Sequence, residues 1–392
     1  MEDQERGNHK PKLGVWEREV NGVKRPTIML PHHLVEKILE KLPVESLIKF
    51  KCVSKEWKLT MMSQYFKERQ MMFSQRSHDP NILFVQTNRN YWNAPAKICV
   101  NTLTLRSSVF VKSRSYYPLC DKSFALVTKS CDGLICMYGF MRWIYVINPS
   151  IKWYRSLPLA RFQNLVEHLD TRRAPDGRIA FPLLGLGRDN KNGVYKLVWL
   201  YNSKVLELDN TTTCEVFSFN SNIWRNVTGS PYEVDYCDNP TYVDGSLHWL
   251  STVTNSKRHI VCFDLSSETF EVSMKIPFTT DGHVTISNMK DRLCISEGKD
   301  MKQEIWSLNS GKKWEKTYSI DLNRTSIWFR HDPNLPTQTI TTFQKNKILL
   351  HSWKIIGHTL IVHDPEQNSY GLAFKFKHRG ISIAYFPSLL TV

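Results

Sequence analysis

Cysteine, histidine and acidic residues are the first candidates for chemistry in this chain. Cys131 and Cys136 are separated by four residues rather than by the two typical of a zinc-ligand pair, and no second pair completes a site. Asp132 and His248 could act as catalytic groups, but neither has a partner nearby in the sequence. Asp132 is better placed to shape the turn at Gly133, and His248 is expected in a strand with its ring hydrogen-bonded. The sequence therefore predicts no metal site and no catalytic residue.

Motifs that hold phosphates or present a nucleophile are also missing. Gly185 and Gly187 lack the third glycine of a dinucleotide-binding loop, and the chain contains no GxxxxGK[ST] phosphate loop. No G-x-S-x-G nucleophile elbow occurs either. We therefore expect no cofactor and a protein that works by binding.

The composition is that of a globular chain with a basic surface. Its 392 residues are 41% hydrophobic and 12% aromatic, which is enough for a sizeable core and for two or three domains, or one small and one large. The formal net charge is +15, yet the basic residues are scattered singly, with Lys24-Arg25 and Lys312-Lys313 as mere pairs. This scatter disfavours nucleic-acid binding and favours a solvated surface, or one complementary to an acidic partner.

Cysteine usage and hydropathy indicate the compartment. No apolar stretch of a signal peptide follows the basic start, and no run of about eighteen apolar residues could span a membrane. The 9 cysteines are odd in number and irregularly spaced, which indicates free thiols in a reducing compartment. We therefore expect a protein of the cytoplasm, the nucleus or both, without a membrane partner.

Residues 30–57 combine two Leu-Pro steps with three short amphipathic segments. Pro31 suits the first turn of a helix and Pro43 ends it, and between them apolar residues recur at helical spacing: Leu34, Val35, Ile38, Leu39 and Leu42. A second helix is expected at about residues 44–50, and Ser54 is a candidate N-cap for a third. A segment this small can hardly bury a core of its own, so we expect it to dock on another surface.

A helical subdomain packed on its neighbour would also explain this segment, but the spacing is more specific. It resembles an F-box, with LP at 30–31, L at 34, IL at 38–39, LP at 42–43, SL at 46–47, F at 50 and CVSKEW at 52–57. In that family the three helices dock on a Skp-type adaptor. The resemblance implies an adaptor-facing surface and its supporting core, which sequence does not separate, at Leu30, Pro31, Leu34, Val35, Ile38, Leu39, Leu42, Pro43, Leu47, Phe50, Val53 and Trp57. His32 and His33 depart from the usual acidic or polar residues, and we interpret them as solvated.

From residue 82 onward, short β-prone runs alternate with Gly, Asn, Asp and Pro. We expect strands at 82–87, 98–105, 133–138, 143–149, 194–201, 214–219, 247–251, 259–265, 292–297, 304–309, 347–353, 359–364 and 370–376. Five units end alike, with an apolar strand, a turn on Asn-Pro, Asn-Ser, Asp-Leu-Ser or Asp-Pro, and an aromatic residue: Trp153, Trp224, Phe270, Trp314 and Tyr370. Repeats of about 40 to 50 residues suggest propeller blades, each aromatic packing on the next blade, with a loop inserted at residues 160–190.

The units SCDGLIC…VINPSIKWYRSLP and GSLHWL…IVCFDLSSETFEV resemble the F-box-associated and kelch-like repeat domains of plant F-box proteins. The paired glycines of typical kelch repeats are missing, so the F-box-associated type is the better match, and blade number and closure stay open. The expected fold is an α+β multidomain chain. It comprises a disordered lead-in at 1–26, a three-helix F-box with a helical bridge at 27–73, and an all-β, propeller-like repeat domain at 80–388.

The resemblance also implies a function. The chain would be the non-catalytic substrate-recognition subunit of an SCF-type (Skp–cullin–F-box) E3 ubiquitin ligase, with the F-box on the adaptor, and through it a cullin, and the β domain on an unknown target protein. An alternative is an adaptor-bound binding scaffold that is not engaged in ubiquitination. A third is an enzyme built on a propeller, for which we find no cluster of Asp, His and Arg on blade-entry loops. Neither the target surface nor a small-molecule co-ligand is identified by the sequence.

Overall fold

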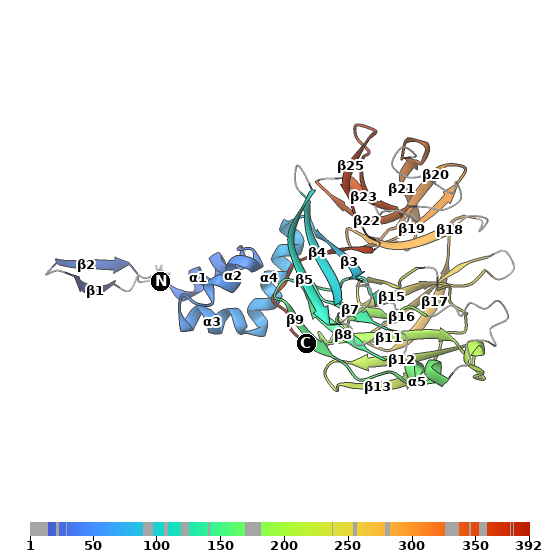
Figure 1. The fold of residues 1–392 in the computed structure, drawn as a ribbon, viewed down its shortest axis with the longest axis horizontal. Helices are drawn as coiled ribbons and strands as arrows, with labels where there is room; N and C mark the ends of the chain where they lie inside the picture. Colours follow the sequence, from blue (N-terminus) through green and yellow to red (C-terminus); the bar gives the residue numbers. More distant parts are fainter. Residues whose placement is uncertain are drawn as a thin grey trace, which may run out of the picture. The chain divides into compact units, whose positions relative to one another are not determined.

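A computed structural model describes the chain in two compact units, Met1–Ser77 (unit 1) and His78–Val392 (unit 2) (Figure 1). The residues described are 15–20, 23–28, 30–88, 97–105, 109–118, 125–139, 142–168, 182–236, 238–253, 257–278, 283–325, 337–344, 346–352, 359–376, 378 and 380–392. Within them, no helix is long and apolar enough to cross a membrane.

Unit 1 begins with a two-stranded antiparallel hairpin, β1 (Val15–Val20) and β2 (Val23–Ile28), in which Val20 pairs with Val23. A disordered lead-in is expected over residues 1–26, whereas the structure pairs strands at 15–20 and 23–28, and residues 1–14 lie outside the described part of the chain. The physical reason is visible in the sequence, because Asn-Gly between two β-prone runs is the strongest short-range hairpin signal. That signal outweighs the polar composition on which the expectation rested.

Four helices follow in unit 1: α1 (His32–Glu40), α2 (Val44–Phe50), α3 (Lys55–Met62) and α4 (Gln64–Ser77). Pro31 and Pro43 precede α1 and α2 in extended backbone conformation, as expected for residues whose missing N–H costs a helix start nothing. The predicted N-cap of the third helix is confirmed, since Ser54 Oγ accepts a 3.1 Å hydrogen bond from Trp57 N. The predicted helical bridge corresponds to the end of α3 and to α4.

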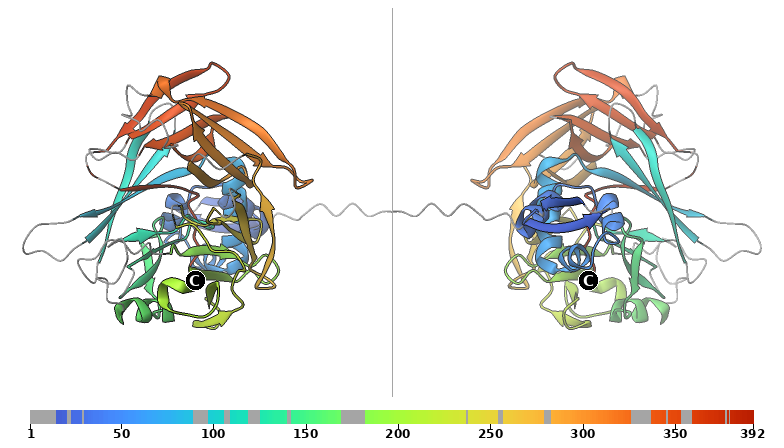
Figure 2. Two further views of the ribbon diagram at one scale, coloured as in Figure 1. Left: turned by 90° about the vertical axis from the view of Figure 1, so that its right-hand side faces the viewer. Right: turned by 90° about the vertical axis from the view of Figure 1, so that its left-hand side faces the viewer.

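Unit 2 contains, in its described part, six four-stranded antiparallel sheets arranged in a ring (Figure 2). Five of these blades are formed by four successive strands. They are β6 (Leu126–Val127), β7 (Ile135–Tyr138), β8 (Ile144–Asn148), β9 (Trp153–Ser156); β10 (Gly185–Arg188), β11 (Tyr195–Asn202), β12 (Thr212–Ser218), β13 (Ile223–Val227); β14 (Thr241–Val243), β15 (Ser246–Leu250), β16 (His259–Asp264), β17 (Thr269–Lys275); β18 (His283–Met289), β19 (Arg292–Lys299), β20 (Lys302–Leu308), β21 (Trp314–Asp321); and β22 (Gln338–Phe343), β23 (Lys347–Ser352), β24 (Thr359–Asp364), β25 (Ser369–Lys375).

The sixth blade joins the two ends of unit 2. Its order is β26-β3-β4-β5, so the last strand, β26 (Ile381–Tyr385), pairs with β3 (Asn81–Asn88), and β4 (Lys97–Leu105) and β5 (Val109–Pro118) lie outside them. This pairing closes the ring non-covalently and answers the question of blade number and closure. Unit 2 is an all-β propeller, so the predicted fold class, a small helical F-box unit followed by a propeller-like domain, is confirmed. Three short helical segments interrupt the described strands: α5 (Arg161–His168), which lies in the predicted inserted loop, η2 (Ser203–Leu206) and η3 (Asn323–Thr325).

Three aromatic side chains on outermost strands link their blades to the preceding ones. Trp224 Nε1 donates to Pro158 O at 2.8 Å, and Trp314 Nε1 donates to Lys275 O at 3.0 Å. The Tyr370 hydroxyl likewise accepts a 3.0 Å hydrogen bond from the backbone of β21. For these three residues the prediction of packing on the next blade is wrong in direction, because the polar atom of each ring finds its partner in the outermost segment of the preceding blade.

Candidate protein-docking site

The core of unit 1 determines which apolar side chains remain available for docking. Leu39 and Leu47, from α1 and α2, are 1% and 0% exposed, and Met61 of α3 is equally buried. Phe66 and Met71 on α4 complete this core. A fully buried side chain of this kind stabilises the fold by about 1.5–3 kcal/mol, so these positions hold the unit together.

A polar contact ties α4 to α1 beside this core. Arg69 donates to the Glu40 carboxylate at 2.9 Å, and Gln70 Nε2 donates to the Leu42 carbonyl oxygen at 3.3 Å. Burial raises the pKa of Glu40, while the neighbouring Arg69 guanidinium opposes that shift. The fourth helix is therefore fixed on the first by both apolar and polar contacts.

Seven large apolar side chains stay exposed between residue 30 and the end of α3, and two of them, Leu59 and Met62, lie in the second half of α3. The other five have exposed fractions from 38% for Leu34 and Ile48 to 59% for Val53. We call these five the docking surface: Leu30, Leu34, Ile38, Ile48 and Val53. A set of exposed apolar side chains gathered on a few short helices is typical of a surface that binds another protein.

The structure divides the twelve predicted adaptor-binding residues into three groups. Leu39 and Leu47 are buried, and Pro31, Val35, Leu42, Phe50 and Trp57 are partly buried. Leu30, Leu34, Ile38, Pro43 and Val53 are exposed. Phe50 and Trp57 meet edge to face with ring centroids 5.9 Å apart and so link α2 to α3. The division separates candidate contact residues from supporting ones, while their role in binding stays a prediction.

Ile48 belongs to the docking surface but was not among the predicted residues. It precedes Lys49 on α2 and follows the buried Leu47 directly. Neighbouring residues on a helix point about 100° apart, so both cannot face one small core. That spacing is the signal that could have placed Ile48 outside.

His32 was expected to be solvated, but in the structure its ring contacts two side chains. Its Nδ1 lies 3.0 Å from Glu56 Oε1, and its Nε2 lies 3.0 Å from Thr60 Oγ1. Both partners belong to α3, so His32 links the start of α1 to the third helix. Because these groups are largely exposed, the contact adds little to stability.

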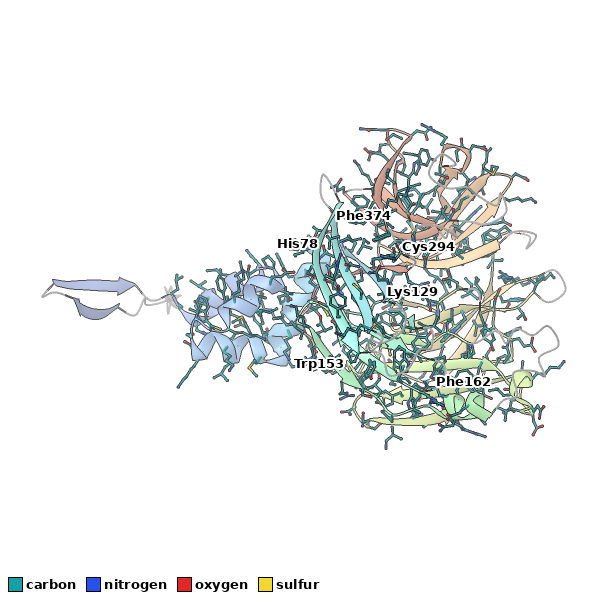
Figure 3. The ribbon with its side chains drawn as sticks, in the orientation of Figure 1. His78, Lys129, Trp153, Phe162, Cys294 and Phe374 are labelled. Atoms are coloured by element: carbon teal, nitrogen blue, oxygen red, sulfur yellow. The ribbon has the colours of Figure 1, made fainter. Side chains whose placement is uncertain are left out.

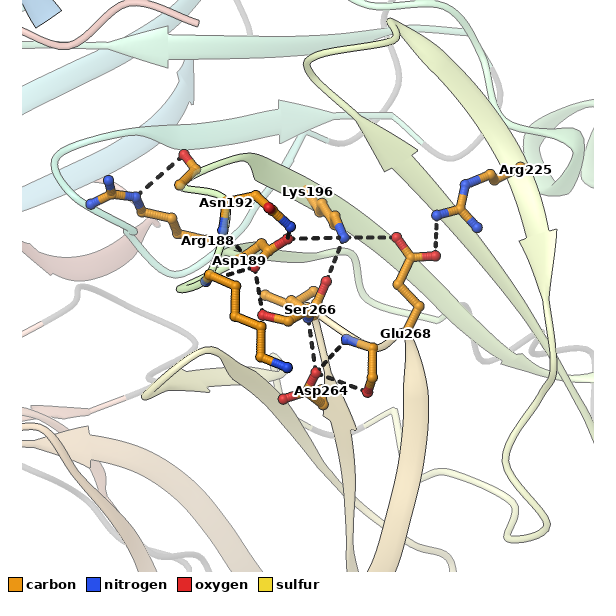
Figure 4. A network of polar contacts seen from close by, with 12 residues as sticks. Arg188, Asp189, Asn192, Lys196, Arg225, Asp264, Ser266 and Glu268 are labelled. Atoms are coloured by element: carbon orange, nitrogen blue, oxygen red, sulfur yellow. Dashed lines mark hydrogen bonds and ion pairs between the residues drawn. The ribbon is translucent and has the colours of Figure 1, made fainter.

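In unit 2, the charged residues that could suggest an enzyme are paired across blades (Figure 4). Lys196 Nζ on β11 lies 2.7 Å from Glu268 Oε1 and 3.6 Å from Asp189 Oδ2. Arg225 on β13 pairs with the same Glu268, which lies in the turn between β16 and β17. The network therefore joins two neighbouring blades, and its lysine and arginine offset the charges of its two carboxylates.

A second polar cluster occupies the centre of the ring, where Figure 3 labels Lys129. Lys129 Nζ lies 2.6 Å from Thr241 Oγ1, 2.7 Å from Ile286 O and 2.9 Å from Asn239 O. Asp238 accepts a 2.9 Å bond from the Ile286 amide and lies 3.7 Å from the Lys129 ammonium. Burial lowers the pKa of Lys129, and Asp238 opposes that shift. Since β14 and β18 are innermost strands, these side chains satisfy backbone groups at the free inner edges of the blades.

The residues first considered for chemistry have structural roles. Asp132 and Gly133 have φ angles of 52° and 82°, which confirms the predicted turn, and Asp132 also accepts a 2.9 Å bond from the Tyr195 hydroxyl. His248 lies buried in β15 with Nδ1 3.2 Å from Thr241 O, as predicted, and burial lowers its pKa to about 4.

The two closely spaced cysteines, Cys131 and Cys136, are buried. Burial raises the pKa of the Cys131 and Cys136 thiols, which disfavours the reactive thiolate. The described cysteines are free thiols: Cys52, Cys99, Cys131, Cys136, Cys214, Cys262 and Cys294. Among these only Cys52 is exposed.

Comparisons with known proteins agree with both units. Residues 28–69 match the F-box domain family, and residues 92–392 match the F-box associated beta propeller domain family. F-box/LRR-repeat/kelch-repeat protein At1g09650 of Arabidopsis thaliana is 40% identical over 375 residues, covering 93% of this chain and 97% of the relative. F-box protein At2g34280 of the same plant is 37% identical over 398 residues, covering 93% and 99%. F-box protein At5g10340 is 37% identical over 380 residues, covering 93% and 85%. The helices that carry the docking surface and the ring that follows them thus have one explanation: the chain belongs to the plant F-box proteins with a C-terminal F-box associated beta propeller domain.

Proposed function

We propose that this chain is the substrate-recognition subunit of an SCF-type E3 ubiquitin ligase. The observation that carries the proposal is the docking surface, five exposed apolar side chains on the first two helices of an F-box and on the segments beside them. On this proposal Leu30, Leu34, Ile38, Ile48 and Val53 contact a Skp-type adaptor, and the adaptor joins the chain to a cullin. The buried and half-buried residues beneath, such as Leu47 and Trp57, fix the helices that present that surface.

The proposed mechanism is proximity without side-chain chemistry. The F-box holds the adaptor, and the propeller holds a target protein, so that target lysines meet a ubiquitin-loaded conjugating enzyme at a raised effective concentration. The saturated ion pairs of unit 2 support this reading, because Lys196, Glu268 and Asp189 are occupied in holding blades together. The protein then acts as a receptor, and the ligase complex supplies the reaction.

The target is proposed to be a protein with acidic surface. The formal net charge of +15 would favour such a partner, and its binding would weaken as ionic strength rises. Free, mostly buried thiols among the described cysteines support residence in a reducing compartment, the cytoplasm or the nucleus.

The adaptor contact is tested by changing exposed side chains that the core does not need. Replacing both Leu34 and Ile38 by Ser should weaken binding to a recombinant Skp-type adaptor by about 2 kcal/mol or more, roughly thirtyfold. The helix content should stay unchanged, because neither side chain is in the core of unit 1. The matched control is Leu372→Ser, an exposed leucine of the propeller that should bind as the wild type does. Wild-type affinity in the double variant would refute the proposed contact.

A second readout separates the ligase receptor from the adaptor-bound scaffold. Affinity purification of the full chain from plant cell extract should recover adaptor and cullin together, and the Leu34/Ile38 variant should recover neither. Adaptor without cullin would favour the scaffold. Proteins recovered equally with both baits would be candidate targets of the propeller.

A further inference from the structure

The corner between α1 and α2 is held by two neighbouring residues of α4. Arg69 Nη2 donates to Glu40 Oε2 at 2.9 Å, and Gln70 Nε2 donates to the Leu42 carbonyl oxygen at 3.3 Å. Glu40 is the last residue of α1, and Leu42 stands just before Pro43, the residue that precedes α2. We call Arg69 and Gln70 the corner clasp, because both bind the short turn in which the chain changes direction.

The turn that the corner clasp holds bears on the shape of the docking surface. Leu34 and Ile38 lie on α1 and Ile48 lies on α2, so the angle between the two helices sets the relative positions of these side chains. Of the other three helices in unit 1, α4 is the one against which α1 chiefly packs. The direction of α1, and with it the shape of the docking surface, therefore depends on α4.

The pair of Glu40 and Arg69 is less exposed to water than an ordinary surface ion pair. The Glu40 side chain is 11% exposed and that of Arg69 is 33% exposed. Burial raises the pKa of Glu40 and the Arg69 guanidinium opposes that shift, while Glu36 raises this pKa and Lys37 lowers it. Arg69 Nη1 also donates to the Tyr65 hydroxyl at 3.0 Å, which fixes the guanidinium in place. A carboxylate in such a position depends on its partner charge.

We propose that Arg69 is a positioning residue for adaptor binding, which acts through Glu40 on the direction of α1. The inference rests on the proposed function and deepens it, because it names a residue outside the docking surface that controls the same contact. Without the guanidinium, the Glu40 carboxylate would be a buried charge that has lost its partner, and it would turn toward water. The end of α1 would move with it. A protonated carboxyl carries no charge and can stay in place.

The experiment measures the affinity of the full chain for a recombinant Skp-type adaptor at about pH 7.5 and about pH 5.5, each relative to the wild type at the same pH. Arg69→Met removes the charge and keeps an extended side chain. Arg69→Lys keeps the charge, and Glu40→Gln combined with Arg69→Met removes both charges. The matched control is Arg76→Met, at an exposed arginine in the last turn of α4. Circular dichroism records the helix content of every variant.

We expect Arg69→Met to bind the adaptor on the order of tenfold more weakly than the wild type at the higher pH, with unchanged helix content. The deficit should shrink at the lower pH, because Glu40 then binds a proton and needs no partner charge. The Glu40→Gln and Arg69→Met double variant should bind within about threefold of the wild type at both pH values. Arg69→Lys should stay in that range, and Arg76→Met should bind as the wild type does.

Wild-type affinity in Arg69→Met would overturn the inference while leaving the proposed function intact. So would a deficit that neither the lower pH nor Glu40→Gln relieves. A weakening that accompanies a loss of helix content, in Arg69→Met and in the double variant alike, would assign Arg69 to folding alone and would also overturn the inference. No adaptor binding by the wild type would overturn both the inference and the proposed function.

Discussion

A buried amide helps to hold the segment after β26, and this contact allows a sharp prediction. Asn148, at the end of β8, is fully buried, and its Nδ2 lies 3.0 Å from Ser388 O and 2.9 Å from Leu390 O. Its Oδ1 accepts a 3.0 Å bond from Ser150 N, which shapes the turn that follows. Leu389 and Leu390 are 1% exposed, so the amide and two leucines fix the tail on the blade β6–β9. That tail follows the strand that closes the ring.

The predicted perturbation is Asn148→Ala. It leaves two buried carbonyl oxygens and one partly buried N–H without their amide partner, at a cost of about 1 kcal/mol each at the low end of the usual range. We therefore expect the free energy of unfolding to fall by roughly 3 kcal/mol. An unfolding entropy of about 2.1 cal/mol/K per residue, applied to a unit of roughly 300 residues, gives about 0.6 kcal/mol per kelvin. The midpoint of thermal unfolding should thus fall by about 5 °C.

Tryptophan fluorescence is a suitable assay, because all tryptophans except Trp16 and Trp57 lie in unit 2. The control is Asn220→Ala, an exposed asparagine in the corresponding turn of the next blade. Its midpoint should stay within about 1 °C of the wild type. A shift for Asn148→Ala no larger than that of the control would refute the assignment of the tail's anchor. Asn148→Asp should be at least as damaging, since a carboxylate would face carbonyl oxygens.

Three further predictions concern the other special positions. Ser54→Ala should reduce the stability of unit 1 by about 1 kcal/mol in denaturant unfolding followed by circular dichroism, whereas Ser54→Gly should cost only a few tenths; equal losses would argue against the cap to Trp57. Gly133→Ala should lower the unfolding midpoint, because a Cβ there would lie 2.5 Å from Phe386 O at a positive φ; a variant as stable as wild type would contradict the close approach. The pKa of His248 is about 4 in the folded chain and about 6.5 in the unfolded chain. The free energy of unfolding should therefore fall by about 3 kcal/mol as the pH drops through that interval, because the unfolded chain binds the proton first. His248→Phe should not show this loss when unfolding is compared at about pH 7 and about pH 4.5.

The helices of unit 1 were predictable because their signals are local. Pro31, Pro43 and Ser54 stand at the start of α1, α2 and α3, and each acts through its own backbone geometry or side chain. Such signals need no knowledge of distant residues. The hairpin β1–β2 has an equally local signal in Asn-Gly, so it too is predictable from the sequence.

The strands of unit 2 were predictable chiefly in the middle of each blade. All thirteen predicted strands correspond to observed ones, and twelve of them are middle strands, the exception being β25, the outermost strand of its blade. Most middle strands are largely buried, as the fully buried β8 illustrates, and therefore appear as apolar runs. The innermost strands went unrecognised, and two of them are short or rich in glycine, since β6 has only two residues and β10 reads Gly-Leu-Gly-Arg. The longer innermost strands β18 and β22 interrupt their apolar residues with Thr, Ser or Gln, so they lack the continuous apolar run of the middle strands.

The sixth blade could not be derived from repeats at all. It is assembled from β26 and β3, whose partners Ile383 and Leu83 are 300 positions apart in the chain. No repeat period connects them, so five units were predicted where the ring has six blades. The direction of the aromatic contacts was predicted wrongly for a related reason. Whether Trp314 reaches the preceding or the next blade depends on the order of blades in space, which a linear pattern leaves undetermined.

The fourth helix explains why the predicted site mixed core with surface. An amphipathic pattern marks apolar positions but does not say how many of them one small core can absorb. In unit 1, α4 supplies Phe66 and Met71, which together with Leu39 bury one stripe of each short helix. Apolar residues outside that stripe, such as Ile38, have no place in the core and stay exposed. A change at Phe66 should therefore abolish adaptor binding by unfolding the unit, whereas a change at Ile38 should do so with the fold intact. The docking surface is thus the apolar remainder of a core that is already full, and only the position of α4 reveals it.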